Sequence, residues 1–245
     1  HEPRKRAQAV FVEQEKYKQA KDIAGAFAHE IRNTLFPARF ALNRLGKAEP
    51  TQTVTDADIP ARVHDLNRAV TRAIDLTSLI SRYTKLESEY KPEVCNLAEA
   101  VASAISDLSV PLHERCIVVT TDGPADTTVR FGRLHLGIVL TNLLRNSLDA
   151  LAGRSDSTIA IRWSAANNTV LLTLADNGPG IPPEHRGRIF DAFFTTKPDS
   201  GTGLGLATVR RLVDMYSGTV TLKDTPDGCC FLLSLQGAQP EPETD

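Results

Sequence analysis

A histidine followed directly by a glutamate lies in residues 27–36, F-A-H-E-I-R-N-T-L-F. An imidazole titrates near neutral pH, so the Glu30 carboxylate could orient one ring nitrogen of His29 and leave the other free for nucleophilic attack. Asn33 lies four residues after His29 and shares its helical face. A His-Glu pair alone usually indicates only a solvated surface, so its meaning depends on the rest of the chain.

Two polar clusters further along the chain have the composition of a nucleotide site. Asn142 and Asn146 lie one helical turn apart in T-N-L-L-R-N-S-L-D-A, and amide oxygens suit a hard cation such as Mg²⁺ that also binds phosphates. Asp176 opens D-N-G-P-G-I-P, where a carboxylate could accept from an exocyclic amine and Gly178 and Gly180 let the backbone approach a flat ring. Each cluster also has a plainer explanation, as solvated asparagines on a helix and as a tight turn.

Two more clusters follow at once. R-I-F-D-A-F-F-T-T-K, residues 188–197, offers phenylalanines to anchor a loop and Lys197 to balance phosphate charge, although the phenylalanines could equally pack on the core. G-T-G-L-G-L-A begins at Gly201 and leads into an expected helix, whose free N–H groups and positive dipole end can hold phosphate. It does not follow the first strand of a βαβ unit, so a dinucleotide site is not indicated.

A long amphipathic helix must position His29. Apolar residues recur at alternating steps of four and three, which predicts a helix over residues 4–45 with a bend at Pro37. After a polar loop over 47–58, the same spacing continues from residue 59 to Ile80. Two such helices form an antiparallel hairpin, and pairing of two hairpins as a four-helix bundle would cover both apolar seams. Packing against a second domain is the alternative.

The periodicity changes after residue 92. The pattern predicts strands up to residue 97 and over 116–121, 127–131, 158–164, 169–175, 219–223 and 229–235, and helices over 98–108, 134–151 and 204–216. The turn at Asn167-Asn168 joins two strands as a hairpin. Helices interleaved with a mostly antiparallel sheet predict an α+β sandwich. We divide the chain into a helical hairpin (1–91), a second domain (92–238) and a disordered acidic tail (239–245).

Composition excludes several classes of protein. With 245 residues, of which 41% are hydrophobic, the chain is long enough for one or two domains. Its net charge of -2 lacks the basic excess that is typical of a protein that binds nucleic acid. No apolar run or secretory signal indicates membrane contact, so we expect a cytoplasmic protein. The chain begins without methionine inside an expected helix, so we expect a longer parent protein. Its cysteines lack C-x-x-C spacing, which favours reduced thiols over zinc or disulfides.

In this order the clusters resemble the catalytic core of a bacterial sensor histidine kinase, over about residues 10–236. Residues 27–36 resemble the phosphoacceptor box, the asparagine cluster the N box, 176–180 the first glycine box, 190–194 the F box and 201–205 the second glycine box. H-E-I-R-N, Pro37 and F-F-T-T-K are most similar to the nitrogen-regulation subgroup. Thr34 stands where the family usually has proline, so we expect the associated bend to be weaker or shifted toward Pro37.

The resemblance implies a homodimer with a four-helix bundle and an ATP-binding domain of the gyrase, heat-shock chaperone and mismatch-repair type. The γ-phosphoryl group of Mg-ATP would move to His29 and then to an aspartate of a response regulator. Glu30 would orient His29 and accept its proton, and Asn33 would hold a water that dephosphorylates the regulator. Residues 187–200 would form a lid.

The same resemblance implies the members of the nucleotide site. Asn146 would hold Mg²⁺ with support from Asn142, Asp176 would bind the adenine amino group, and Lys197 would approach the γ-phosphate. The backbone around the nucleotide would come from Gly178, Gly180, Gly201, Thr202, Gly203, Leu204 and Gly205.

Two other classes of function share parts of this pattern. An ATP-gated conformational ATPase of the same superfamily would have the nucleotide clusters but would not need a histidine box on a separate hairpin. A catalytically inactive dimeric scaffold could bind a regulator, but it would not need Asn146, Asp176 and the second glycine box. Neither a nucleic acid nor a membrane is expected as a partner of this chain.

Overall fold

The structure is a computed structural model of the chain, and it describes residues 63, 70, 90–197, 202–223, 225 and 227–238. The chain divides into two compact units, His1–Thr84 and Lys85–Asp245. The first predicted helix, the four-helix bundle, the His29 segment and the acidic tail lie outside the described residues. Of the predicted second helix, Val63 and Val70 are described, and both are helical. The description below concerns the second unit.

The second unit interleaves helices and strands, which confirms the predicted α+β organisation. In chain order the elements are β1 (Glu93–Asn96), α3 (Leu97–Asp107), α4 (Ser109–Glu114), β2 (Val118–Asp122), β3 (Thr128–Phe131), α5 (Arg133–Ala150), β4 (Thr158–Ala166), β5 (Thr169–Asp176), α6 (Pro183–Arg186), α7 (Gly205–Met215), β6 (Thr219–Lys223) and β7 (Cys229–Gln236).

Within the described residues, the larger sheet has five strands in the order β2-β4-β5-β7-β6. Strands β2 and β4 are parallel, and the other neighbours in this sheet are antiparallel. Strands β1 and β3 pair separately as a second, antiparallel sheet. Asn167 and Asn168 have φ of 49° and 62°, the left-handed conformation that a two-residue hairpin turn requires, so the predicted β4–β5 hairpin is confirmed.

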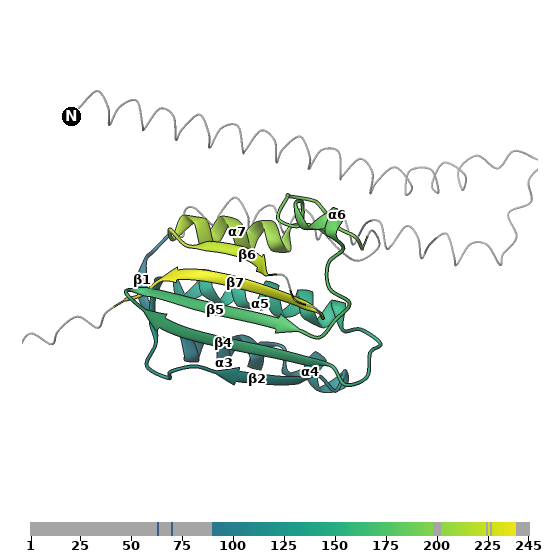
Figure 1. Ribbon diagram of the computed structural model, residues 1–245, viewed down its shortest axis with the longest axis horizontal. Coiled ribbons are helices and arrows are strands. Elements are labelled where there is room, and N and C mark those ends of the chain that lie inside the picture. Colours follow the sequence, from purple (N-terminus) through teal and green to yellow (C-terminus); the bar gives the residue numbers. More distant parts are fainter. Residues whose placement is uncertain are drawn as a thin grey trace, which may run out of the picture. The chain divides into compact units, whose positions relative to one another are not determined.

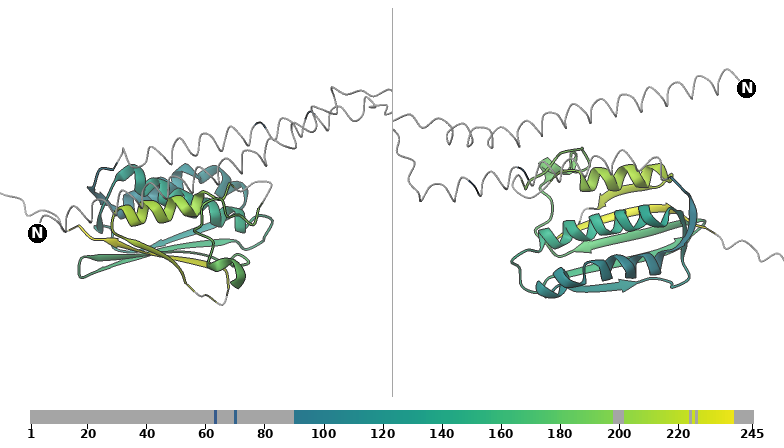
Figure 2. Two further views of the ribbon diagram at one scale, coloured as in Figure 1. Left: turned by 90° about the horizontal axis from the view of Figure 1, so that it is seen from above. Right: turned by 180° about the vertical axis from the view of Figure 1, so that it is seen from behind.

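The helices α3, α5 and α7 cover one face of the large sheet, as Figures 1 and 2 show. Alternate residues of β5, Val170, Leu172 and Leu174, are at most 1% exposed, as expected for a strand with one covered face. Leu140 and Leu144 of α5 are completely buried. The core therefore lies between the sheet and a central α5, which holds that helix firmly against β5.

Two short helices differ from the prediction. The predicted helix over 98–108 is present as α3, but a separate helix, α4, follows it and contains Pro111. Proline is tolerated in a first helical turn because its missing N–H would have no partner there. The same reason applies to α6, which begins at Pro183. Neither α4 nor α6 was predicted from the sequence.

Candidate functional site

The carboxylate of Asp176 is fixed from two sides at the end of β5. Asp176 is only 7% exposed. Ser147 Oγ donates a hydrogen bond to Asp176 Oδ2 at 2.8 Å, and the Gly178 backbone N–H donates to Oδ1 at 3.0 Å. Each carboxylate oxygen keeps a further lone pair for another donor. Asp176 is thus an oriented acceptor, which is the geometry that the predicted binding of an exocyclic amine would require.

The turn after Asp176 is held in place by Asn177. Its Oδ1 accepts from the Thr158 backbone N–H at 2.8 Å, and its Nδ2 donates to the Asp156 carbonyl at 2.7 Å. A side chain on Gly178 would place its Cβ 2.8 Å from Asp176 Oδ1 and 3.3 Å from Ala150 Cβ. Only glycine therefore lets this turn lie so close to α5. Gly180 continues the same turn with a φ of 74°.

The two predicted asparagines on α5 have different surroundings. Asn142 Nδ2 donates to the Ile138 carbonyl of its own helix at 2.8 Å. A Cβ on Gly205, the first residue of α7, would lie 3.1 Å from Asn142 Oδ1, so this amide faces the start of α7. Asn146 Nδ2 is buried and has no hydrogen-bond partner among the residues that the structure describes.

A buried amide group without a partner costs about 1–3 kcal/mol, so its presence calls for an explanation such as a ligand. Rotating the Asn146 side-chain amide by half a turn exchanges its oxygen and nitrogen, so an oxygen can equally occupy this position. An amide oxygen is a suitable ligand for Mg²⁺, which needs few protein ligands when substrate phosphates supply the others. In the described part of the chain no group of three His, Cys, Asp or Glu residues could hold a metal ion. The single amide oxygen of Asn146 fits a cation whose other ligands are phosphate oxygens and waters.

The phenylalanine segment anchors a loop between α6 and α7. Ile189 is 6% exposed, and the ring centroids of Phe190 and Phe231 on β7 are 6.3 Å apart. The Phe193 backbone N–H donates to the Gly203 carbonyl at 2.9 Å, which connects this loop to the second glycine cluster. Phe190 thus packs on the core residue Phe231, the alternative that the sequence left open, and this contact holds the loop on β7. Residues 198–201, including Gly201 and part of the predicted lid, lie outside the described residues.

The second glycine cluster leads into α7 without a side-chain cap. Gly203 has a φ of 66°, and a Cβ at this position would collide with the Phe193 backbone. The Thr202 hydroxyl accepts from the Leu204 N–H at 3.5 Å, and Leu204, only 2% exposed, is the N-cap residue of α7. Because no side chain in the described part of the chain caps the helix, the N–H groups of its first turn can donate to an anionic ligand.

Lys197 forms an ion pair that the sequence did not predict. Its Nζ lies 3.4 Å from Asp149 Oδ2 on α5, and the two side chains are 40% and 55% exposed. Ser147 and Asp149 were both missed as site residues. The available signal was their place in the same helical turn as Asn146, but only the fold shows that Ser147 faces Asp176 and that Asp149 faces Lys197.

Cys229 lies directly opposite Asp176 in the β5–β7 ladder. Burial raises the pKa of the Cys229 thiol to about 12, and the neighbouring Asp176 charge adds to this shift. Cys229 therefore stays a neutral thiol at physiological pH and contributes packing next to the site. Cys95, Cys229 and Cys230 are buried free thiols, whereas Cys116 is free and exposed.

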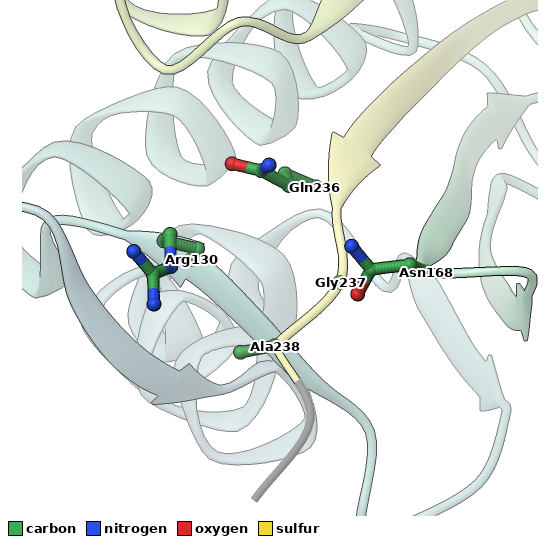
Figure 3. A pocket seen from close by; sticks show the side chains of 5 residues that line it. All are labelled: Arg130, Asn168, Gln236, Gly237 and Ala238. Carbon is green, nitrogen blue, oxygen red and sulfur yellow. The ribbon is translucent and has the colours of Figure 1, made fainter. Parts of the chain in front are cut away.

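A pocket of 480 Å³ lies at the opposite end of β5 from Asp176. It is lined by Arg130, Asn168, Gln236, Gly237 and Ala238 (Figure 3). The length of β5 separates Asn168 from Asp176 by roughly 25 Å at the usual rise per strand residue. None of the predicted site residues lines this pocket, so it is separate from the site described above.

Among the described helices, none is long and apolar enough to cross a membrane.

Comparison with known proteins adds independent information about this site. Residues 132–239, which include α5, the two glycine clusters and α7, match the family described as histidine kinase-, DNA gyrase B-, and HSP90-like ATPase. The catalytic domain of histidine kinase ThkA, a solved structure, is 26% identical with a TM-score of 0.56. The match covers 60% of this chain and 96% of that one. ThkA in complex with response regulator protein TrrA has a TM-score of 0.69 over 92% of this chain and 64% of that chain, with 20% identity.

Relatives also match over most of this chain. The C4-dicarboxylate transport sensor protein DctB of Rhizobium meliloti (strain 1021) is 32% identical over 218 residues, which is 88% of this chain and 34% of that protein. The nitrogen regulation protein NtrY of Azorhizobium caulinodans is 26% identical over 231 residues, 91% of this chain and 29% of that protein. The chain thus spans about a third of the length of these relatives.

Proposed function

We propose that the chain is the catalytic core of a sensor histidine kinase of a bacterial two-component system, which binds Mg-ATP and transfers the γ-phosphoryl group to His29. The group then passes to an aspartate of a response regulator. The observation that carries the proposal is the side-chain amide of Asn146, whose Nδ2 is buried without a hydrogen-bond partner among the described residues. Asn146 lies on α5, the same helix whose Ser147 orients Asp176. A buried amide without a partner lowers the stability of a helix that has only a structural role, whereas a bound nucleotide with its cation would supply the missing partner.

The residues present fit an adenine nucleotide. Asp176 is an oriented, buried acceptor that suits the amino group of adenine, and the glycines at 178 and 180 would let the backbone of the turn approach a flat ring. Asn146 would contribute its amide oxygen to Mg²⁺, which neutralises phosphate charge when it is bound. The uncapped start of α7 at Gly205 would supply backbone N–H groups to phosphate oxygens. Thr202, Gly203 and Leu204 belong to that same segment, and Gly201 is proposed with them.

Transfer needs a nucleophile and a way to remove its proton. We assign Nε2 of His29 as the atom that attacks the γ-phosphorus of ATP, while the bond from phosphorus to the β-phosphate oxygen breaks and ADP leaves. Glu30 accepts a hydrogen bond from His29 Nδ1–H and takes up that proton as the imidazole becomes phosphorylated. The chemistry depends mainly on position and charge, so approach of the ATP-binding domain to the histidine would be enough to control it.

The first 91 residues are proposed to form the dimeric four-helix bundle that presents His29. The match with DctB is longer than the whole chain beyond residue 91, so the similarity extends into this hairpin. A solved relative, ThkA, is described as a complex with a response regulator protein, which supports a regulator as the partner of this chain. This extent of similarity favours a kinase over an ATPase of the same superfamily without a histidine box, and over an inactive scaffold.

Labelled ATP tests the proposed function directly. The purified chain with Mg²⁺ and γ-labelled ATP should acquire label that is lost in acid and retained in base, as expected for a phosphoramidate. His29→Gln should abolish the label and leave ATP affinity nearly unchanged. His113→Gln, a change in an exposed histidine on α4, is the matched control and should label normally. Label that persists on His29→Gln would show that another residue is the acceptor.

We further propose that Asn33 positions a water for dephosphorylation of the regulator, because the spacing from Glu30 to Asn33 is typical of the phosphatase signature. Asn33→Ala should slow the loss of phosphate from the phosphorylated regulator while His29 still acquires label. Equal rates for Asn33→Ala and the unchanged chain, with Mg²⁺ and nucleotide present, would contradict this role.

A further inference from the structure

The ion pair between Asp149 and Lys197 connects two parts of the nucleotide site. Asp149 lies three residues after Asn146 on α5, so the two side chains are neighbours on the helix surface. Lys197 ends the described part of the loop that carries the phenylalanines, and its Nζ lies 3.4 Å from Asp149 Oδ2. Lys197, which the family resemblance places near the γ-phosphate, is thus paired with a carboxylate on the helix that bears the proposed cation ligand Asn146.

The backbone of Lys197 is fixed independently of this ion pair. The Lys197 N–H donates to the Thr195 hydroxyl oxygen at 3.0 Å, and that hydroxyl lies 3.4 Å from the Lys197 carbonyl. The side chain, a flexible four-carbon stem with a compact charge, can therefore change partner without movement of the backbone. Both side chains of the pair are about half exposed, and exposed ion pairs contribute little to stability. An incoming phosphate can thus displace the Asp149 carboxylate easily.

We propose that Asp149 is a positioning residue that holds Lys197 until the γ-phosphate of ATP replaces its carboxylate as the partner of the lysine. This inference rests on the proposed function, since it concerns the triphosphate in the same site. Two effects act against ATP: the existing pair must break, and the released Asp149 carboxylate remains close to phosphate charge. Both effects fall mainly on the nucleotide that has a γ-phosphate. Asp149 therefore lowers the affinity of the site for ATP relative to its affinity for ADP. ADP, the product, then competes more effectively with ATP, the substrate, for the same site.

The test compares the binding of two nucleotides to the full chain. Binding of ADP and of the non-hydrolysable analogue adenylyl imidodiphosphate is measured by calorimetry with Mg²⁺. Asp149→Asn should strengthen binding of the analogue by about two- to fivefold, the scale of a partly exposed charge pair, and leave ADP binding nearly unchanged. Asp149→Glu keeps the charge and should behave like the unchanged chain. Asp214→Asn, which removes a carboxylate paired with Arg210 on α7, is the matched control for overall charge and should change neither affinity.

A double variant separates action through Lys197 from a general charge effect. Lys197→Met alone should weaken binding of the analogue. Without Lys197, Asp149→Asn should raise the ratio of analogue affinity to ADP affinity less than it does with Lys197 present, because only the repulsion between the carboxylate and the phosphate is then removed. The inference is wrong if Asp149→Asn weakens binding of the analogue, as it would if Asp149 supported the cation, or if the ratio changes equally with and without Lys197. Absence of binding of either nucleotide to the unchanged chain would instead contradict the proposed function.

Discussion

Ser147 Oγ donates a hydrogen bond to Asp176 Oδ2 at 2.8 Å and so connects the middle of α5 to the end of β5 inside the site. Both residues are buried, at 1% and 7% exposure. A hydrogen bond to a charged group in such surroundings contributes about 1.5–3 kcal/mol. Ser147 therefore fixes the direction in which Asp176 presents its remaining lone pairs.

We predict that Ser147→Ala weakens ATP binding about tenfold, or about 1.4 kcal/mol, because Asp176 loses a donor that orients it. Ser147→Thr keeps the hydroxyl and should lose less. Calorimetric titration with Mg-ATP measures the effect, and Ser164→Ala, a change at an exposed position of β4, is the control. If Ser147→Ala is folded and binds ATP like the unchanged chain, Asp176 does not depend on this hydrogen bond.

A second prediction compares two glycines at opposite ends of the same loop. Gly203→Ala places a Cβ against the Phe193 backbone at a φ of 66°, so the contact between the two segments must open. We expect a loss of at least about 1 kcal/mol in the free energy of unfolding, together with weaker ATP binding. Gly187→Ala is the matched control, because nothing lies within 4 Å of its Cβ position and its φ of -70° suits alanine. Equal stability of the two variants in urea unfolding would refute this explanation.

The elements that positioned the site could be predicted because their signals are local. The spacing of Asn142 and Asn146 on one helix, and the Asn167-Asn168 turn between alternating strands, are both read within a few residues. The short helices α4 and α6 depend on where proline falls within a turn, which periodicity does not show. The partners of Asp176 and Lys197 depend on contacts between distant segments. Such contacts follow from the packing of α5 against β5, so no local pattern reveals them.

A third prediction concerns stability at high pH. The pKa of the Cys229 thiol is raised from 9.0 to about 12, first by burial and then by the Asp176 charge. The unfolded chain loses this proton near pH 9 and the folded chain does not, so the stabilising contribution is complete below about pH 9 and is lost as the pH rises toward 12. The expected loss is about 1.4 kcal/mol for each pH unit within this range.

Urea unfolding of the unchanged chain and of Cys229→Ala at several pH values from 8 to 11 measures this contribution. The free energy of unfolding should fall less steeply with pH in Cys229→Ala, with a difference in loss of about 1.4 kcal/mol by pH 10. Cys116→Ala, a change at an exposed cysteine, should follow the unchanged chain. Tyr216, whose pKa is also raised by burial, is present in all three proteins, so its titration cancels in the comparison. Parallel curves for all three proteins would contradict the prediction.

The last prediction separates binding from stability at Asn146. Its Nδ2 is buried without a partner, so Asn146→Ala removes an uncompensated polar group and also favours the helix. We therefore expect the nucleotide-free protein to be at least as stable as the unchanged chain, by up to about 1 kcal/mol more. The affinity for Mg-ATP should fall at least about tenfold, because the cation loses an amide ligand. Arg145→Ala, a change in the exposed preceding residue, is the control for both measurements. A variant that loses stability while its Mg-ATP affinity stays unchanged would mean that this amide supports the fold of α5 and takes no part in the site.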